Sequence, residues 1–314
     1  MQGIISAMVK TSSQRFNAER ADFIKKLRNI ISEKHILSSD EELHPYECDG
    51  LSAYRQRPWL VVLPGTIEQV QSILILCLDE NIPVIARGAG TGLSGGALPL
   101  DKGVLLSLAR FNQILDIDPI TRTARVQPGV RNLAITQAAE QYQLYYAPDP
   151  SSQIACTIGG NIAENSGGVH CLKYGLTVNN VLQIKLLTMD GELITLGGSG
   201  LDGPGYDLLA LMNGSEGMLG IVVEATVKLL PKPERIQVLM AAFNDVTKAG
   251  QAVAETIGAG IIPAGLEMMD SLAIRAAEAF VHAGYPEDAQ AILLCELDGS
   301  NAEVSEQILS LIHI

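Results

Sequence analysis

The sequence has few basic residues, few cysteines and no long apolar run. Lys and Arg together number 22 against 35 Asp and Glu, which leaves the 314 residues with a net charge of −13. This deficit of positive charge argues against nucleic acid or an anionic membrane surface as a partner. The apolar runs are far shorter than the roughly 20 residues that a membrane span needs. An apolar fraction of 47% is nevertheless enough for a large core, which a chain of this length divides into about two domains.

The cysteines and histidines are too scattered to indicate a metal centre. The five cysteines include no CxxC pair, and no two of the five histidines share a ligand spacing. We therefore predict no zinc site and no iron–sulfur cluster within the chain, and we expect a reducing compartment. Residues 1–10 have neither a basic n-region nor a long apolar h-region, so no signal peptide is expected. Together these absences predict a cytoplasmic protein.

A glycine-rich stretch, Arg87–Gly96, follows a strand-like apolar run and is the most informative part of the sequence. Glycine adopts positive φ without strain, and successive amides in such a stretch can point to one side and bind an anion. By itself the stretch fits a phosphate cradle and a plain surface loop equally well. It also contains GxGxxG, with Asp116 about 20 residues later, as in a Rossmann fingerprint. Chain breakers and a strand-like segment at 104–108 follow where that fingerprint requires a helix, so we expect loop amides to bind the phosphates.

Apolar periodicity predicts the elements around this stretch. Residues 60–63 and 82–86 have the character of buried strands, and a helical pattern lies between them, opened by Thr66 with Gln69 three positions later. The glycine stretch therefore closes a β-α-β unit. The pattern also predicts helices over 17–34 and 133–143 and hairpins over 114–127 and 181–196.

Two further glycine-rich segments lie at 157–168 and 213–220. Such segments suit close packing of a helix on a strand, or a wall against which a flat ligand lies, and their number in one domain favours the wall. Residues 231–234 contain two prolines and resemble a linker, so we place a domain boundary there. Strand-like and helical segments then alternate to the last residue, which predicts a small α/β domain with an antiparallel or mixed sheet. We expect this domain to be truncated, because the chain ends within a helical segment.

Four motifs together resemble one known family. They are ARGAGTGLSGG at 86–96, the segment 148–168, KYG at 173–175 and the segment 205–233. They resemble the FAD-linked oxidases of the vanillyl-alcohol-oxidase type, within these the D-2-hydroxy-acid dehydrogenase group, and most of all the flavoprotein subunits of glycolate oxidases. The resemblance implies an α+β fold, with an N-terminal helical segment at 1–54, a PCMH-type FAD-binding domain of two α+β subdomains at 55–233, and a partial α/β cap domain at 234–314.

The resemblance also implies FAD as the cofactor. Some members attach FAD covalently through a histidine in the glycine stretch, but this stretch contains neither His nor Cys, so we predict non-covalent FAD. By resemblance the stretch binds the pyrophosphate, and Pro150, Ser151 and the segment 157–165 line the isoalloxazine and ribityl part. Gly217, Gly220 and Ile221 would lie beside the second half of the cofactor. The implied cofactor-binding residues are Arg87, Gly88, Ala89, Gly90, Thr91, Gly92, Leu93, Ser94, Gly95, Pro150, Ser151, Thr157, Ile158, Gly159, Gly160, Asn161, Ala163, Asn165, Gly217, Gly220 and Ile221.

The implied reaction is oxidation of a small 2-hydroxy acid, with glycolate to glyoxylate as the first expectation. Electrons would leave through partner subunits, one of them an iron–sulfur protein, and any membrane association would come through those partners. D-lactate dehydrogenase of the same family and a catalytically incomplete FAD-binding fragment remain alternatives. An absorbance spectrum of bound flavin separates all of these from an enzyme that uses NAD.

The catalytic residues stay unassigned. In this subfamily the metal ligands and the base lie in motifs resembling HxGDGNxH and GEHG, which this sequence lacks, so we expect them beyond residue 314. His170, Lys173 and Tyr174 follow the second glycine-rich segment, where they could face the flavin. A loop histidine bonded to backbone and a lysine at the surface are the simpler interpretations, and we do not assign these residues to catalysis.

Overall fold

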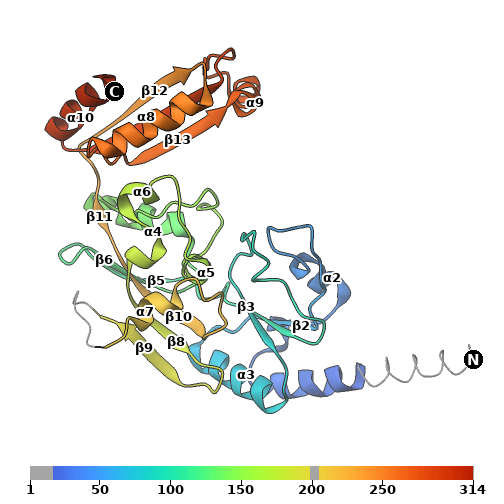
Figure 1. The fold of residues 1–314 in the computed structure, drawn as a ribbon. Helices are drawn as coiled ribbons and strands as arrows, with labels where there is room; N and C mark the ends of the chain where they lie inside the picture. Colours follow the sequence, from blue (N-terminus) through green and yellow to red (C-terminus); the bar gives the residue numbers. More distant parts are fainter. Residues whose placement is uncertain (1–16, 199–204, 314) are drawn as a thin grey trace, which may run out of the picture.

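A computed structural model of the chain describes residues 17–198 and 205–313. In this part of the chain, two large sheets, a two-stranded sheet of residues 144–145 and 230–231, and their helices form a body. A three-stranded sheet with its own helices forms a cap above it (Figure 1). No helix of the described residues is long and apolar enough to cross a membrane.

The first sheet of the body has the strand order β1-β2-β4-β3. The strands β2 (Leu60–Val62), β3 (Val84–Arg87) and β4 (Val104–Ser107) are parallel to one another, and β1 (Ile36–Leu37) is antiparallel to β2. Helix α3 (Ile67–Asp79) connects β2 to β3. The Thr66 hydroxyl caps α3 by accepting a hydrogen bond from the Gln69 N–H. The predicted β-α-β unit is confirmed, with β4 inserted between its two strands.

The described segment between β3 and β4 forms no helix. Residues 88–103 run as turns and irregular backbone directly into β4. The rejection of a Rossmann fingerprint is therefore confirmed, because the helix that it requires after the glycines is not there.

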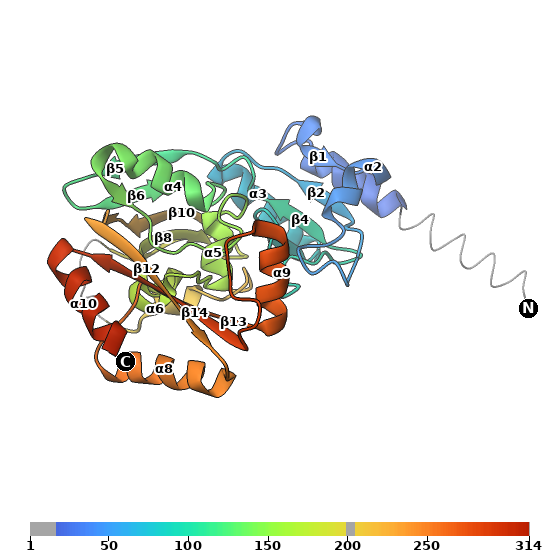
Figure 2. The same ribbon diagram turned by 90° about the horizontal axis from the view of Figure 1, so that it is seen from above.

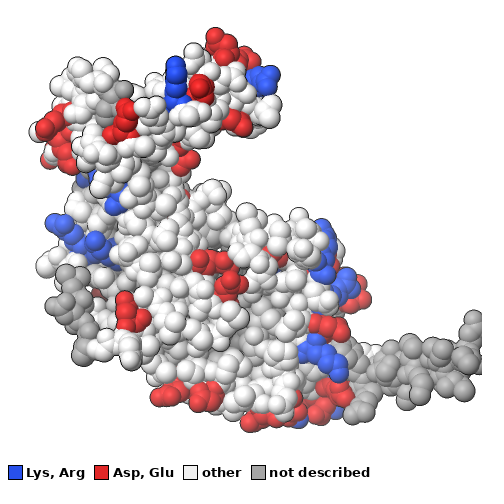
Figure 3. Space-filling model, viewed as in Figure 1, with Lys and Arg blue, Asp and Glu red and all other residues white. Residues whose placement is uncertain are grey.

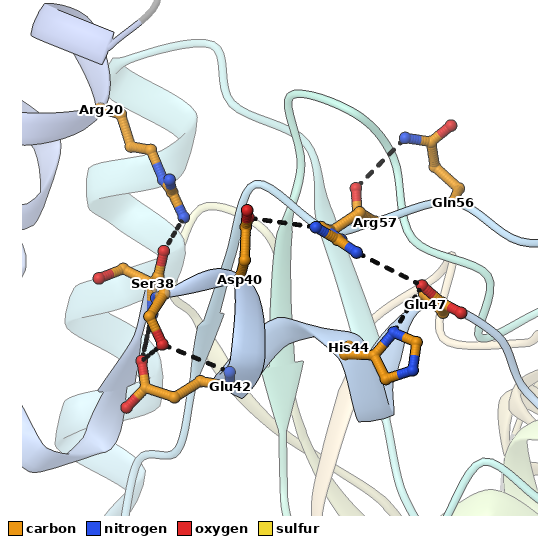
Figure 4. A network of polar contacts seen from close by, with 9 residues as sticks. Arg20, Ser38, Asp40, Glu42, His44, Glu47, Gln56 and Arg57 are labelled. Atoms are coloured by element: carbon orange, nitrogen blue, oxygen red, sulfur yellow. Dashed lines mark hydrogen bonds and ion pairs between the residues drawn. The ribbon is translucent and has the colours of Figure 1, made fainter.

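The N-terminal part lies against the first sheet. Residues 17–27 are helical, and the 3-10 turns and helix that follow are η1 (Glu33–His35), α2 (Asp40–Leu43) and η2 (His44–Tyr46). The predicted helix over 17–34 is too long, because the backbone changes to i→i−3 hydrogen bonds at Asn29 and Ile30 before it enters β1. Arg57, just before β2, lies 3.2 Å from Asp40 and 3.9 Å from Glu47, which ties this part to the body (Figure 4).

The second sheet of the body is antiparallel, in the order β5-β6-β10-β8-β9. Both predicted hairpins are confirmed: one is β5 (Ile114–Asp118) with β6 (Thr123–Val126), the other β8 (Val181–Leu187) with β9 (Leu193–Gly197). Strand β10 (Ile221–Lys228) lies between the hairpins. The remaining elements are α4 (Asn132–Ala139), η3 (Glu140–Tyr142), β7 (Leu144–Tyr145), α5 (Ile158–Glu164), α6 (Cys171–Tyr174), η4 (Thr177–Asn179), α7 (Leu208–Met212) and β11 (Leu230–Pro231).

The two sheets of the body share a core. Leu187, Ile221 and Val223 come from the second sheet, yet they belong to the apolar cluster of the first sheet. They pack there with residues of α3 and β4, such as Ile73 and Leu106, which are fully buried. The edge where β10 begins is therefore held close to the loop that follows β3.

The cap is an antiparallel sheet with helices. Its strands β12 (Arg235–Phe243), β13 (Gly265–Asp270) and β14 (Ala291–Gly299) are arranged in the order β12-β14-β13. The helices are α8 (Val246–Gly258), α9 (Ser271–Val281) and α10 (Asn301–His313). The prediction of an antiparallel or mixed sheet alternating with helices is confirmed. Figure 2 shows the cap sheet lying above α5 and α6 of the body.

Candidate functional site

The three glycine-rich segments meet around one cavity. Its volume is about 360 Å³, and it lies between the loop after β3, helix α5 and the turn before β10. Of the residues predicted to bind the cofactor, the structure places these at the cavity: Arg87, Gly88, Ala89, Gly90, Thr91, Gly92, Leu93, Ser151, Thr157, Gly159, Gly160, Asn161, Ala163, Gly217, Gly220 and Ile221.

Five of the predicted residues do not line the cavity, each for a structural reason. Ile158 is fully buried in the core of the second sheet. Asn165 ends α5 in the left-handed conformation, and its side chain accepts a hydrogen bond from the Val178 N–H at 2.9 Å. Ser94 turns to Glu164, 3.1 Å from the carboxylate. Gly95 and Pro150 belong to the turns beside the cavity.

The loop after β3 lines the cavity with free backbone amides. In the described structure, the N–H groups of residues 88–97 donate no hydrogen bond to the protein. In α5, by contrast, the amides of Ile158, Gly159 and Gly160 all donate within the protein. A row of backbone amides without protein acceptors can form an anion-binding concavity. Of these two segments, only the loop therefore has amides left to donate to a bound anion.

Arg87 supports this loop from beneath. Its side chain is buried, its Nη1 donates to the Cys48 carbonyl at 2.8 Å, and its guanidinium lies 5.7 Å from the centre of the Tyr46 ring. A Cβ on Gly90 would overlap this guanidinium, so the loop packs directly on it. Burial lowers the pKa of Arg87, while the nearby Asp49 carboxylate opposes that shift. The group places positive charge directly under the free amides.

The loop also packs tightly against α5. A Cβ on Gly88 would overlap the Thr157 hydroxyl, and the same hydroxyl accepts from the Gly160 N–H at 3.4 Å. Thr157 thus caps α5 and contacts the loop at once. The sequence predicted Thr157 as a site residue but did not predict the helix that it opens, because two glycines and an alanine hide the helical periodicity of 158–164.

A buried asparagine that was not predicted from the sequence holds two walls of the cavity together. Asn132 is 1% exposed, and its Nδ2 donates to the Pro148 carbonyl at 2.9 Å and to Asn161 Oδ1 at 3.0 Å. It occupies the same face of α4 as the buried Ile135 and Ala139. A polar residue at a core position of an amphipathic helix was the signal for it, because such a group is buried only when it is hydrogen-bonded.

Two glutamates at the cavity were also missed. Glu164 and Glu216 both line it. A Cβ on Gly96 would contact both of their carboxylates, so only a glycine fits there without displacing one of them. Glu216 adopts φ 53°, a conformation that few non-glycine residues take. Both residues thus line the same cavity as the loop with the free amides.

His170 and Lys173 do not match the simpler interpretations of the sequence. His170 is bonded to side chains and not to backbone carbonyls: Nδ1 lies 2.6 Å from Asp149, and Nε2 lies 3.1 Å from Glu296 of the cap. Lys173 is not a free surface charge, because its Nζ lies 2.5 Å from Asp298. The side chains of His170, Lys173 and Tyr174 all meet the cap, whose position over α6 no local sequence pattern indicates.

The described residues offer no metal site. No group of three or more His, Cys, Asp and Glu side chains within 17–198 and 205–313 is arranged to hold a metal ion.

Comparison with known proteins assigns both parts of the chain. A model of the FAD binding domain matches residues 58–197, and a model of the C-terminal domain of FAD linked oxidases matches residues 232–313. Glycolate oxidase subunit GlcD of Escherichia coli (strain K12) is 65% identical over 290 residues, which cover 92% of this chain and 58% of that protein. D-lactate dehydrogenase of Anaerostipes hadrus is 33% identical over 306 residues, covering 95% of this chain and 64% of that protein.

Known structures agree at the level of the fold. Alkyldihydroxyacetonephosphate synthase superimposes with a TM-score of 0.81 at 20% identity, over 93% of this chain and 58% of that one. The chain thus spans less than two thirds of the length of these relatives. Both matched models and the shared fold agree with the α+β, PCMH-type architecture implied by the glycine motifs, and the chain belongs to the FAD-linked oxidases.

Proposed function

We propose that the cavity between the loop after β3, α5 and β10 binds FAD, and that the free amides of residues 88–97 bind its pyrophosphate. The observation that carries this proposal is that row of amides, packed on the buried Arg87. Oriented amides neutralise a diphosphate without a basic surface, which suits a chain of net charge −13. The carboxylates of Glu164 and Glu216 suit the hydroxyls of the sugar parts, which donate hydrogen bonds.

The second and third glycine-rich segments would hold the flat part of the cofactor. Gly159 and Gly160 of α5 and Gly217 and Gly220 before β10 all face the cavity. Residues without side chains let a planar ring lie close to the backbone. We therefore keep the predicted set of site residues as the proposed FAD site, with Ser94, Gly95, Pro150, Ile158 and Asn165 supporting it from behind. FAD would be bound non-covalently, because residues 86–97 include neither His nor Cys.

For the complete protein we propose oxidation of a small 2-hydroxy acid, with glycolate as substrate and glyoxylate as product. When bound, FAD takes up the two electrons of this oxidation. The chain's own residues bind the cofactor, orient it and position the cap above it. The support for glycolate is the 65% identity to a glycolate oxidase subunit, against 33% to a D-lactate dehydrogenase.

The same relatives motivate the proposed partners. The Escherichia coli relative is named a subunit, so we propose that the protein works within a complex, with an iron–sulfur partner subunit receiving the electrons. We place it in the cytoplasm, with any membrane contact made by the partners. We also propose that the domain boundaries are the predicted ones, with the N-terminal helical segment at 1–54, the FAD-binding domain at 55–233 and the cap domain at 234–314.

Titration of the purified chain with FAD tests the proposal. We expect FAD to bind, to show the visible absorbance of oxidised flavin, and to be released as free flavin by acid. Flavin that stays with the denatured protein would contradict non-covalent binding, and no binding at all would overturn the site.

Substrate choice needs a second experiment. Adding glycolate or D-lactate to the FAD-loaded complete protein in the absence of oxygen is expected to bleach the flavin, faster with glycolate. Faster bleaching by D-lactate would favour the dehydrogenase alternative. If FAD bound to the chain of residues 1–314 is bleached by neither glycolate nor D-lactate, this result would favour a catalytically incomplete FAD-binding fragment.

A further inference from the structure

Six polar side chains join the cap to the body beside the cofactor cavity. On the body they are Asp149, in the loop before α5, and His170, Lys173 and Tyr174, at the start of and within α6. On the cap they are Glu296 and Asp298, both on β14. These six residues are called the cap latch below.

One half of the cap latch is centred on Asp298. Its side chain is buried, and it is bonded to Lys173 Nζ at 2.5 Å and to the Tyr174 hydroxyl at 2.6 Å. Lys173 Nζ also donates to the Asp298 backbone carbonyl at 2.6 Å. A buried carboxylate is tolerated only with such partners, so this half requires the cap to stay in contact with α6.

The other half is centred on His170. Its two ring nitrogens bridge Asp149 of the body and Glu296 of the cap, at 2.6 Å and 3.1 Å. Asp149 precedes Pro150, Ser151 and Ser152, and both serines line the cavity. The imidazole thus connects a cap strand directly to the loop that forms one wall of the cofactor cavity.

Two glycines make this approach possible. A Cβ on Gly168 would overlap Asp149, so a side chain there would push that carboxylate away from His170. A Cβ on Gly265, the first residue of β13, would lie 3.0 Å from a methyl group of Val169. The cap sheet and the segment before α6 are therefore in close contact through Gly265 and Val169 as well as through the charged groups.

We propose that the cap latch fixes the cap over the cofactor cavity, and that His170 is a positioning residue that transmits the position of the cap to the loop at 148–152. The proposal rests on the proposed FAD site for its functional meaning. Its contacts are all between protein groups, so it can be tested without FAD.

The surroundings of His170 decide its charge. Its ring is bonded to Asp149 of the body and to Glu296 of β14. The other titratable groups of the packed elements are Lys173 and Tyr174 of α6 with Asp298 of β14, to which they are bonded, Tyr145 of β7, whose ring contacts Tyr174, and Glu267 of β13, which shares the face of Glu296 on the cap sheet. Lys173 is used by Asp298, so negative charge prevails around the imidazole. The hydrogen bond to Asp149 raises the pKa of His170 to about 9, burial opposes this, and the bond to Glu296 adds to it. The imidazole is therefore a cation at neutral pH and can donate to both carboxylates.

Hydrogen exchange on the full chain without FAD tests the cap latch. Glu296→Gln keeps the shape of the side chain and removes its charge. We expect exchange to rise about fivefold or more in peptides that cover 148–156, on the body, although the substitution is on the cap. Gly265→Ala, which changes no charge, is expected to have the same effect. If both variants leave these peptides unchanged, the cap latch does not transmit position and the proposal is overturned.

Matched variants separate the cap latch from a general loss of stability. Lys173→Met should raise hydrogen exchange in β14 above that of the unmodified chain. Lys173→Arg, which keeps the positive charge, should leave exchange in β14 at the unmodified level. Lys185→Met breaks a pair with Glu224 at 2.9 Å inside the second sheet, and should leave β14 unchanged. A rise in β14 with Lys185→Met as large as with Lys173→Met would contradict the proposal.

Histidine NMR measures the titration midpoint of the His170 ring, which a purely structural role would leave unchanged. We expect the His170 ring to titrate near the elevated pKa of about 9, and its midpoint to fall towards the ordinary 6.5 in Glu296→Gln. A midpoint at the ordinary value in the unmodified chain, or one unaffected by Glu296→Gln, would show that the cap does not bond to His170 in solution.

Discussion

At Gly90 the backbone adopts φ +70°, and the Arg87 guanidinium occupies the space where a side chain would begin. An alanine at this position has to distort the loop or displace the arginine. Gly90→Ala should therefore cost about 1–3 kcal/mol of stability. It should also weaken FAD binding by at least about tenfold, since the free amides lose their common direction. Chemical denaturation and FAD titration measure the two effects.

Gly250→Ala is the matched control for Gly90→Ala. Gly250 lies within α8, and a Cβ added there would meet no neighbour within 4 Å. Alanine is the better helix former, so this variant should be more stable by about 0.5–1 kcal/mol and bind FAD normally. If Gly90→Ala also binds FAD normally, the loop amides do not hold the pyrophosphate.

Asn132 does not line the cofactor cavity, but its replacement should reduce the stability of the protein. Asn132→Ala leaves the Pro148 carbonyl and Asn161 Oδ1 without their donor in a buried place. The cost should be about 1–3 kcal/mol in the free energy of unfolding. Gln56→Ala removes an exposed amide bonded to the Arg57 carbonyl, and should change stability by no more than about 0.5 kcal/mol. Equal effects of the two substitutions would contradict the role assigned to Asn132.

At the scale of the elements, two helices begin with the same cap but differ in what lies beside it. Thr66 caps α3, accepting from an amide at 3.3 Å, and Thr157 caps α5, accepting at 3.4 Å. Each Thr→Ala substitution should cost about 0.5–2 kcal/mol. Only Thr157→Ala should also weaken FAD binding, because only Thr157 packs on Gly88 of the loop. Weaker FAD binding in both variants would mean that FAD affinity depends on the overall stability of the protein and not on the contact between Thr157 and Gly88.

The elements show why some of the fold was predictable from the sequence and some was not. The hairpins at β5–β6 and β8–β9 and the helix α3 follow from local apolar period and turn residues, so their prediction was correct. Helix α5 was missed because its glycines have low helix propensity, and its order comes from tertiary contacts of Gly159 with Pro128. The position of β4 between β2 and β3 depends on long-range pairing that no local pattern records.

The same distinction applies to the site. The loop after β3 and the turn before β10 were recognisable because glycine is required wherever backbone approaches a ligand. The bonding partners of His170 and Lys173 in the cap were not predicted, because Glu296 and Asp298 lie more than 120 residues away in the sequence. An ion pair between distant segments is a property of the packed molecule, and a sequence pattern read locally does not contain it.

On the scale of the whole molecule, the charges are mostly acidic and dispersed, and the cap overhangs a hollow side of the body (Figure 3). The apolar clusters of the cap and of the body are separate. Within the described residues, polar contacts at β14 therefore carry much of the connection between the two parts. Such contacts respond to pH, whereas an apolar interface would not.

The pH dependence of stability follows from the sign of the His170 shift. Folding raises the pKa of His170 from 6.5 to about 9, mainly through Asp149, so the folded chain binds this proton more tightly than the unfolded chain. The resulting stabilisation is complete below the ordinary pKa of 6.5 and is lost as pH rises through about 9. His170→Gln should therefore reduce the free energy of unfolding on the order of 1 kcal/mol at neutral pH and have little effect above about pH 10.

Urea unfolding of both proteins across this range measures the difference, and His44→Gln provides the control. His44 also pairs with a carboxylate, Glu47 at 3.2 Å, but it lies exposed in the N-terminal part of the chain. Because an exposed pair is screened by water, its removal should change stability little at any pH. A His170→Gln deficit that is the same at neutral and alkaline pH would mean that the imidazole acts by its shape and not by its charge. In that case the two carboxylates beside it would need another cation to hold the cap in place.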